Sequence, residues 1–253
     1  MKFHRFFIEQ KIQGSSITIT NGALLHQWVH VLHLEKNEEV ALFDGSGLEH
    51  CARIELLDKN QAQLSVVSSQ DPGTEPVIKI TLYQALIKKD NFFLVLQKGT
   101  EVGVSAFTPV LASRSEKKAF NAERGRKIIQ EAAEQSGRVK LPALYEVASL
   151  QDALRQAPKP IVFLHAGVHP HPPTIVGGLS PQGRGELFPL PLRERVRVRG
   201  SLSLFVGPEG GWTPEEVALA KEAGATIVSL GPRTLRAETA GPLAAGIILA
   251  TME

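Results

Sequence analysis

Beyond Val77 the chain alternates short apolar runs with amphipathic segments, and this alternation constrains the fold more than any other feature of the sequence. The apolar runs have the length of buried strands, and the segments between them have helical spacing. Strands are predicted at 78–85, 106–110, 161–164, 203–206 and 226–230, and helices at 89–102, 123–137 and 238–252. Strand–helix alternation predicts an α/β domain with a mostly parallel sheet.

Residues 17–70 instead predict a small β-meander that closes into a barrel. The strand at 39–43 ends at Asp44-Gly-Ser-Gly47, which is a turn signal, and strands at 48–57 and 61–67 flank a polar turn at 58–60. A short helix is expected at 26–34. The segment 68–76 contains proline, glycine and polar residues, as linkers do. We therefore divide the chain into domains 1–72 and 73–253.

Composition and charge narrow the class of protein. The single cysteine, Cys51, forms no internal disulfide. The chain has neither a signal peptide pattern nor an apolar run of bilayer-spanning length, so we expect a soluble, cytoplasmic protein that contacts no membrane. Net charge is +2, but residues 76–140 hold 12 Lys and Arg against 6 Asp and Glu. This basic stretch is interpreted either as a surface that meets phosphates or as a solvated helix face.

Residues 167–200 do not follow the alternation. They are rich in proline and glycine and separate two apolar runs by more than a usual connection, so they are interpreted as a flexible insertion. His165, His169 and His171 lie at its start, but no helix or strand is predicted there to fix metal ligands, and no metal site is expected.

The first candidate site is the loop Gly207-Pro-Glu-Gly-Gly211, which directly follows a predicted strand. Trp212 comes next and is interpreted, like Trp28, as a packing residue. Thr213, Pro214 and Glu216 then have the pattern of a helix N-cap, first helical position and capping box. A glycine loop that opens a helix lets backbone amides approach a ligand closely. Neither a P-loop lysine nor a dinucleotide fingerprint is present, which argues against a nucleotide-binding enzyme of other chemistry.

The second candidate site is the segment 230–240, Leu-Gly-Pro-Arg-Thr-Leu-Arg-Ala-Glu-Thr-Ala, which also follows a strand and opens a helix. Arg233, Arg236 and Glu238 crowd one strand end, where open α/β sheets bind ligands. A surface ion-pair cluster is the alternative interpretation.

Together these two loops resemble the RsmE family of ribosomal RNA uridine N3-methyltransferases, which belongs to the SPOUT superfamily. Further segments are similar to the family pattern: His4–Phe7, Gln97–Gly103, Ser113–Ser115 and Glu131–Arg138. The resemblance implies a PUA-like RNA-binding β-barrel at 1–72 and a SPOUT methyltransferase domain with a trefoil knot at 73–253. It also implies S-adenosylmethionine (SAM) as cofactor, a homodimer, and small-subunit ribosomal RNA or the assembled small subunit as substrate.

The resemblance assigns roles to individual residues. Arg236 is expected to stabilise the uridine anion, and Glu238 to orient the base, to act as general base, or only to brace the last helix. The cofactor is expected at His165, Val206, Gly207, Pro208, Glu209, Gly210, Gly211, Leu230, Gly231, Pro232, Leu235 and Thr239. RNA contacts, mainly to phosphates, are expected from Arg5, Lys98, Arg114, Arg126, Gln135, Arg138 and Arg233. The alternative for each of these charges alone is a solvated surface charge, and the matching motif favours Gln135 and Arg138.

One departure from the family pattern leaves an alternative open. Ala166 follows His165 where the family often has glutamate, and the insertion at 167–200 then enters beside the expected cofactor pocket. The alternative is an RNA-binding module of the same fold in which the insertion has abolished methyl transfer.

Overall fold

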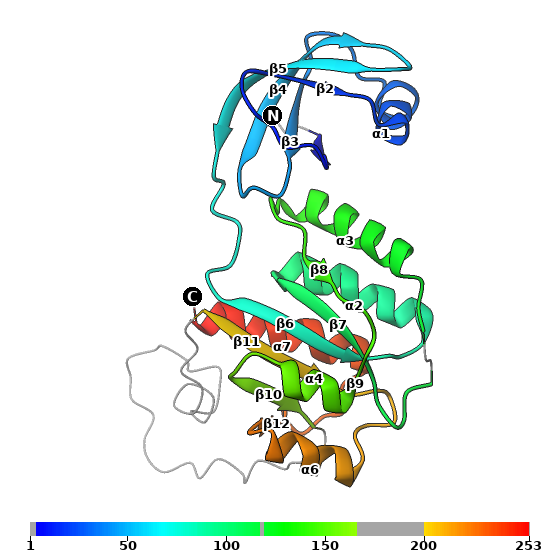
Figure 1. The fold of residues 1–253 in the computed structure, drawn as a ribbon, viewed down its shortest axis with the longest axis vertical. Coiled ribbons are helices and arrows are strands. Elements are labelled where there is room, and N and C mark those ends of the chain that lie inside the picture. The colour runs from blue at the N-terminus through cyan, green and yellow to red at the C-terminus, as the bar shows by residue number, and fades with distance from the viewer. Residues whose placement is uncertain (1–3, 117–118, 166–199, 253) are drawn as a thin grey trace. The chain divides into compact units, whose positions relative to one another are not determined.

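The computed structural model describes residues 4–116, 119–165 and 200–252, and the chain divides into two compact units (Figure 1). The first comprises Met1–Glu75 with Ile129–Leu141, and the second comprises Pro76–Ile128 with Pro142–Glu253. Each unit has its own hydrophobic core and is described separately. In the described part of the chain, no helix combines the length and apolar content that a membrane crossing requires.

The first unit is built on a five-stranded mixed sheet in the order β1-β3-β4-β5-β2. β1 pairs with β3 in parallel, and the remaining neighbours are antiparallel. The predicted turns at 44–47 and 58–60 do join antiparallel strands, which confirms the meander. The strands are β1 (Arg5–Phe7), β2 (Ser16–Ile19), β3 (Glu39–Phe43), β4 (Glu49–Leu57) and β5 (Ala62–Gln70).

Two predicted boundaries in this unit are wrong. β5 continues to Gln70 because Ser68, Ser69 and Gln70 pair with β4, although their polar side chains have the composition of a linker. The predicted helix at 26–34 begins earlier, since α1 (Gly22–His26) is followed by the π-helix η1 (Gln27–Val31). The Asn21 side chain accepts hydrogen bonds from the backbone N–H groups of residues 23 and 24 and thereby starts this helix.

A single carboxylate joins two distant segments of the first unit. Glu75 accepts hydrogen bonds from Arg138 Nε (3.3 Å) and NH2 (2.8 Å) and from the backbone N–H groups of Val139 and Lys140 (both 3.0 Å). The Arg138 side chain is only 4% exposed. Burial raises the pKa of Glu75, but the hydrogen bonds and charge of Arg138 and the two N–H groups outweigh it, so the net pKa is lowered.

The second unit is an α/β domain with the strand order β12-β10-β11-β6-β7-β8, and β9 also pairs with β7. Every pairing among its described strands is parallel, which confirms the prediction of a mostly parallel sheet. The strands are β6 (Lys79–Ala85), β7 (Ala106–Leu111), β8 (Ala143–Leu144), β9 (Ala148–Ser149), β10 (Ile161–Leu164), β11 (Ser201–Val206) and β12 (Thr226–Val228). The helices are α2 (Lys89–Val102), α3 (Ala122–Ser136), whose first turns belong here, α4 (Leu150–Gln156), α6 (Pro214–Glu222) and α7 (Ala237–Met252).

Helices cover both faces of this sheet, and successive side chains of β6 point alternately to the two faces. Tyr83 stacks on Phe205 with ring centroids 4.3 Å apart and belongs to the cluster that includes α4. Leu82 and Gln84 point to the opposite face, where the backbone of α7 at Gly241 lies against both side chains. α7 packs in turn against α2. Because all strands run in parallel, the loops that follow β10, β11 and β12 meet at one edge, which is where α/β sheets bind ligands.

Candidate cofactor-binding site

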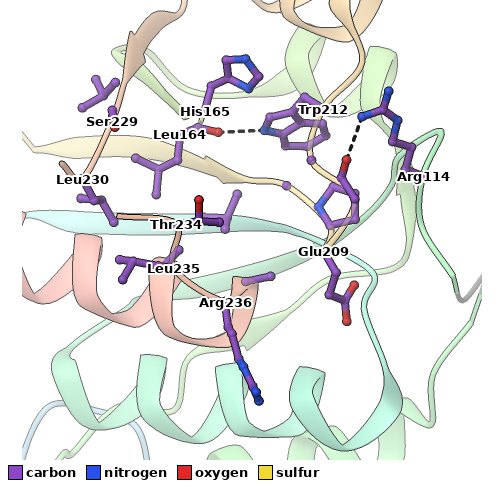
Figure 2. A pocket seen from close by; sticks show the side chains of 18 of the residues that line it. Arg114, Leu164, His165, Glu209, Trp212, Ser229, Leu230, Thr234, Leu235 and Arg236 are labelled. Atoms are coloured by element: carbon purple, nitrogen blue, oxygen red, sulfur yellow. Dashed lines mark hydrogen bonds between the residues drawn. The ribbon is translucent and has the colours of Figure 1, made fainter. Parts of the chain in front are cut away.

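A cavity of about 430 Å³ lies at this edge of the sheet (Figure 2). Three segments form its walls: Leu164 and His165 at the end of β10, Val206–Trp212 from the end of β11, and Val228–Leu230 with Arg233–Ala237 from the end of β12. Arg114, which follows β7, also lines it. Cavities of roughly 300–1,000 Å³ suit small molecules and cofactors. The two loops predicted from the sequence therefore do form opposite walls of one cavity.

The glycine loop lines the cavity with its backbone, and Gly207 lies directly over an indole. A Cβ atom on Gly207 would be 3.0 Å from Nε1 of Trp212. The Trp212 ring is fixed by a 2.9 Å hydrogen bond from Nε1 to the carbonyl of Leu164 and by a contact with Phe163, with centroids 4.5 Å apart. A larger residue at 207 would have to shift this buried ring by a few tenths of an ångström, so the loop favours glycine here.

The helix that follows the loop begins with the predicted capping box. Thr213 Oγ1 accepts from the backbone N–H of Glu216 (3.3 Å), and Glu216 Oε2 accepts from the N–H of Thr213 (2.8 Å). The other carboxylate oxygen of Glu216 accepts from the N–H of Ser113 at 2.7 Å. One buried side chain therefore starts α6 and also ties the segment after β7 to the glycine loop.

Two further contacts fix this loop, and the sequence analysis assigned neither. Gln84 is 1% exposed, and its Nε2 donates to the carbonyls of Ala85 (3.2 Å) and Gly207 (3.5 Å). Glu209 Oε1 accepts from the backbone N–H of Lys88, just before α2. A glutamine inside the apolar run 78–87 is the sequence signal that could have identified Gln84.

The second loop turns sharply and then presents its charged side chains. Ser229 Oγ donates to the carbonyl of Gly231 (3.0 Å) and accepts from its N–H (3.3 Å), while Gly231 has φ +112°, which favours glycine. The Arg236 side chain is 85% exposed, and its NH1 lies 3.8 Å from Oε1 of Glu238. Glu238 itself is 8% exposed, and Oε2 has no hydrogen-bond partner among the described residues.

The predicted site residues fall into two groups. Lining the cavity are His165, Val206, Gly207, Pro208, Glu209, Gly210, Gly211, Leu230, Leu235, Arg114, Arg233 and Arg236. Gly231 and Pro232 lie in the second loop without lining it, and Glu238, Thr239 and Lys98 line a separate groove between α2 and α7. Lining residues that the sequence analysis did not assign to the site include Leu164, Trp212, Val228, Ser229, Thr234, Ala237 and Ala240.

The residues predicted to contact phosphate are dispersed, and two of them are engaged in contacts within the first unit. Arg138 is buried on Glu75, and Arg5 is ion-paired with Glu49 and donates to the carbonyl of Arg138 (3.1 Å). Burial lowers the pKa of Arg5, opposed in part by the charge of Glu134. Both guanidinium groups are thus held inside the first unit. Gln135 and Arg126 are exposed, the latter 4.0 Å from Glu146.

Lys98 bonds to Glu101 at 2.9 Å. The predicted insertion at 167–200 and the histidines His169 and His171 lie outside the described residues, apart from Gly200. Among the residues that are described, no group of three or more histidine, cysteine or acidic side chains is arranged to hold a metal ion.

Comparison with known proteins identifies the family. A family model described as an RNA methyltransferase domain matches residues 74–249. The ribosomal RNA small subunit methyltransferase E of Bacillus subtilis is 32% identical over 93% of this chain and 92% of its own length. The chain belongs to the ribosomal RNA small subunit methyltransferase E family. The family relationship predicted from the two loops is confirmed.

Solved structures of this family have the same architecture. The methyltransferase E from Neisseria gonorrhoeae, bound to SAM, has a TM-score of 0.83 and is 29% identical over 99% of this chain and 98% of its own. A putative methyltransferase of Legionella pneumophila, in complex with SAM, has a TM-score of 0.82 and is 28% identical with the same coverage. The predicted fold, a PUA-like barrel followed by a SPOUT α/β domain, is confirmed, while the trefoil knot stays a prediction.

Proposed function

We propose that this protein is a methyltransferase that transfers the methyl group of SAM to N3 of a uridine in small-subunit ribosomal RNA. The observation that carries the proposal is the cavity at the sheet edge, where a glycine backbone and apolar side chains meet three arginines. Its volume, and the accessible backbone that Gly207 provides over Trp212, fit a nucleoside joined to an amino acid. Family membership supports the same activity.

The chemistry requires a reactive nitrogen and exact positioning. SAM supplies an electrophilic sulfonium methyl group and leaves as S-adenosylhomocysteine, and N3 of uridine becomes a nucleophile when it loses its proton to solvent. Arg236 extends from the second loop with most of its guanidinium exposed, so it can stabilise the negative charge that develops on the base. Alignment of the base with the methyl group and exclusion of water supply the rest of the rate.

Glu238 is assigned to positioning rather than to proton abstraction. It lines the groove between α2 and α7, not the cofactor cavity, and it is 8% exposed. Its carboxylate lies 3.8 Å from Arg236 NH1. At this distance its charge biases the guanidinium toward one orientation, which is how it contributes to the reaction.

A methyl-transfer assay tests the function. Small subunits that lack the modification are incubated with the protein and methyl-labelled SAM, and the methylated base is mapped. Label at N3 of one uridine is the expected result. Binding of RNA without uptake of SAM in calorimetry would instead favour the RNA-binding module.

The barrel at 1–72 is proposed to bind RNA, and a cytoplasmic location follows from a ribosomal substrate. Exposed arginines and lysines near the start of α3 support a phosphate-binding role for the basic stretch. These side chains are Arg124, Arg126 and Lys127. Binding through such contacts is expected to weaken steeply as salt concentration rises.

We further propose that the protein is a homodimer that joins through the groove between α2 and α7. Leu94, Val102 and Leu243 are 40%, 38% and 44% exposed on this face. Among the described residues that line the groove, only Lys98 and Glu238 are charged. Low charge and exposed aliphatic side chains are typical of the core of a self-complementary interface.

Leu243→Glu should convert the dimer to a monomer, because it introduces a charge where the two copies would exclude water. Light scattering after size-exclusion chromatography measures the mass. Leu219→Glu on α6 is the matched control, since Leu219 is 38% exposed outside the groove. This interface would be contradicted if the wild-type protein were a monomer. It would also be contradicted if the Leu243→Glu protein stayed dimeric over the same range of protein concentrations as the wild type.

A further inference from the structure

Arg114 and the residue before it make several contacts with the glycine loop and the helix that follows it. Its NH1 donates to the carbonyl of Gly210 at 2.8 Å (Figure 2). A Cβ atom on Gly210 would be 3.3 Å from both Cβ and Cδ of Arg114, so the aliphatic stem lies along this glycine. The preceding residue, Ser113, donates its N–H to Glu216. The guanidinium therefore has a defined place at the cavity although the side chain is exposed.

The other charged groups of the cavity are arranged differently, and one of them, Arg233, is exposed in the second loop. Arg236 is 85% exposed, with a single ion pair at 3.8 Å, and it comes from the loop before α7. Glu209 directs its carboxylate to the N–H of Lys88, at the start of α2. Among the described cations that line the cavity, Arg114 is the one with a short hydrogen bond to the glycine loop.

The leucines of the cavity lie away from Arg114. Figure 2 shows Leu164, Leu230 and Leu235, with Ser229 and Thr234, on one side and Arg114 with Glu209 and Trp212 on the other. An adenosine suits the side with the leucines, where the backbone can provide hydrogen bonds. A charged amino-acid group suits the end formed by Arg114 and the glycine loop.

A guanidinium has five N–H groups in a planar fork, and NH1 of Arg114 already donates to Gly210. The edge formed by Nε and NH2 can still take a carboxylate with two parallel hydrogen bonds. A fixed guanidinium loses little side-chain freedom on binding, and the place of Arg114 on the lining of the cavity favours a group of the cofactor over a phosphate of RNA. We propose that Arg114 binds the carboxylate of the methionine part of SAM, and is not a phosphate contact.

This proposal rests on SAM being the cofactor, and calorimetry with SAM and methylthioadenosine tests it separately from activity. SAM has the methionine carboxylate and a sulfonium, whereas methylthioadenosine has the same adenosine and a neutral thioether without the amino acid. S-adenosylhomocysteine, a thioether that keeps the carboxylate, controls for the charge of the sulfonium and should lose affinity for Arg114→Gln as SAM does. Arg114→Gln should weaken SAM binding about 10-fold to 100-fold, the effect of losing hydrogen bonds to a charged group. Binding of methylthioadenosine should be unchanged. Arg114→Lys should recover part of the SAM affinity, since it keeps the charge without the fork.

Arg155→Gln is the matched control, because Arg155 is 70% exposed on α4, lies 3.7 Å from Asp152 and does not line the cavity. Equal loss of affinity for both ligands would mean that Arg114 only shapes the loop, and would overturn the proposal. Unchanged SAM affinity with weaker, less salt-dependent binding to an rRNA fragment would overturn it in favour of a phosphate contact. If the wild-type protein bound neither ligand, the proposed cofactor itself would be wrong.

Discussion

Arg236→Ala should lower the rate of methyl transfer to small-subunit RNA by roughly 10²-fold to 10³-fold, as removal of a group that stabilises developing charge does in other enzymes. SAM affinity should be unchanged. The side chain is 85% exposed and makes one ion pair at 3.8 Å, so its loss leaves the core intact. Single-turnover rates at saturating SAM measure the chemical step, and calorimetry measures the binding of SAM.

Arg155→Ala is the control for the loss of an exposed arginine. Arg155 is 70% exposed on α4 and is 3.7 Å from Asp152, a geometry close to that of Arg236 and Glu238. This variant should transfer methyl groups at the wild-type rate. A wild-type rate for Arg236→Ala as well would remove Arg236 from the mechanism, and an equal loss of rate and SAM affinity would make it a cofactor ligand instead.

Glu75→Ala should lower the free energy of unfolding by about 3–5 kcal/mol, the effect expected when one partner of a buried ion pair is removed. The Arg138 guanidinium, 4% exposed, would lose its carboxylate, and the N–H groups of Val139 and Lys140 would lose their acceptor. Urea unfolding followed by circular dichroism measures the change. Glu55→Ala is the control, since Glu55 is an exposed carboxylate that accepts one bond from Ser65.

The contribution of Glu75 to the free energy of unfolding should decrease as the pH falls. The folded-state pKa of Glu75 lies below its usual value of 4.5, so the ionised carboxylate contributes stability above that pH. As the pH falls below about 4.5 and through the folded-state pKa, the contribution is lost, and the stabilities of the wild type and Glu75→Gln should converge. A difference that stays constant from pH 7 to pH 3 would contradict the role of the ionised form.

Glu134 affects the pH dependence of stability in the opposite direction, and comparison of the wild type with Glu75→Gln separates the two carboxylates. Burial raises the pKa of Glu134, although the N–H of Phe7 and the Gln130 side chain oppose this. Its ionisation therefore lowers the stability of the folded state as the pH rises above 4.5. Measuring the difference between the wild type and Glu75→Gln cancels this contribution, because Glu134 is present in both proteins.

Local patterns predicted most of the second unit. The helix at Lys89–Val102 and the strand at Ile161–Leu164 have their predicted bounds, and the capping box at Thr213 and Glu216 is present. These features depend on neighbouring residues, which a sequence displays directly. The helix Leu150–Gln156 and the two-residue strands β8 and β9 were not predicted, because elements this short have too few residues to define a period.

Contacts between distant residues account for the errors in the site. From its position after a helix end, Arg138 is predicted to be an exposed cation. Its burial depends instead on Glu75, which lies 63 residues earlier in the chain. Gln84 reaches Gly207 across 123 residues, and Arg114 reaches Gly210 across 96. Such pairings are set by the order of strands in the sheet, which a strand–helix pattern does not specify.

The indole beneath Gly207 gives this protein an internal optical reporter. Trp212 lines the cavity and is 4% exposed, so a bound ligand changes the surroundings of a fluorophore that bulk solvent barely reaches. The chain contains one other tryptophan, Trp28, which is fully buried in the core of the first unit. Replacing Trp28 with phenylalanine leaves a single emitter, through which the filling of the cavity can be followed in real time without any label.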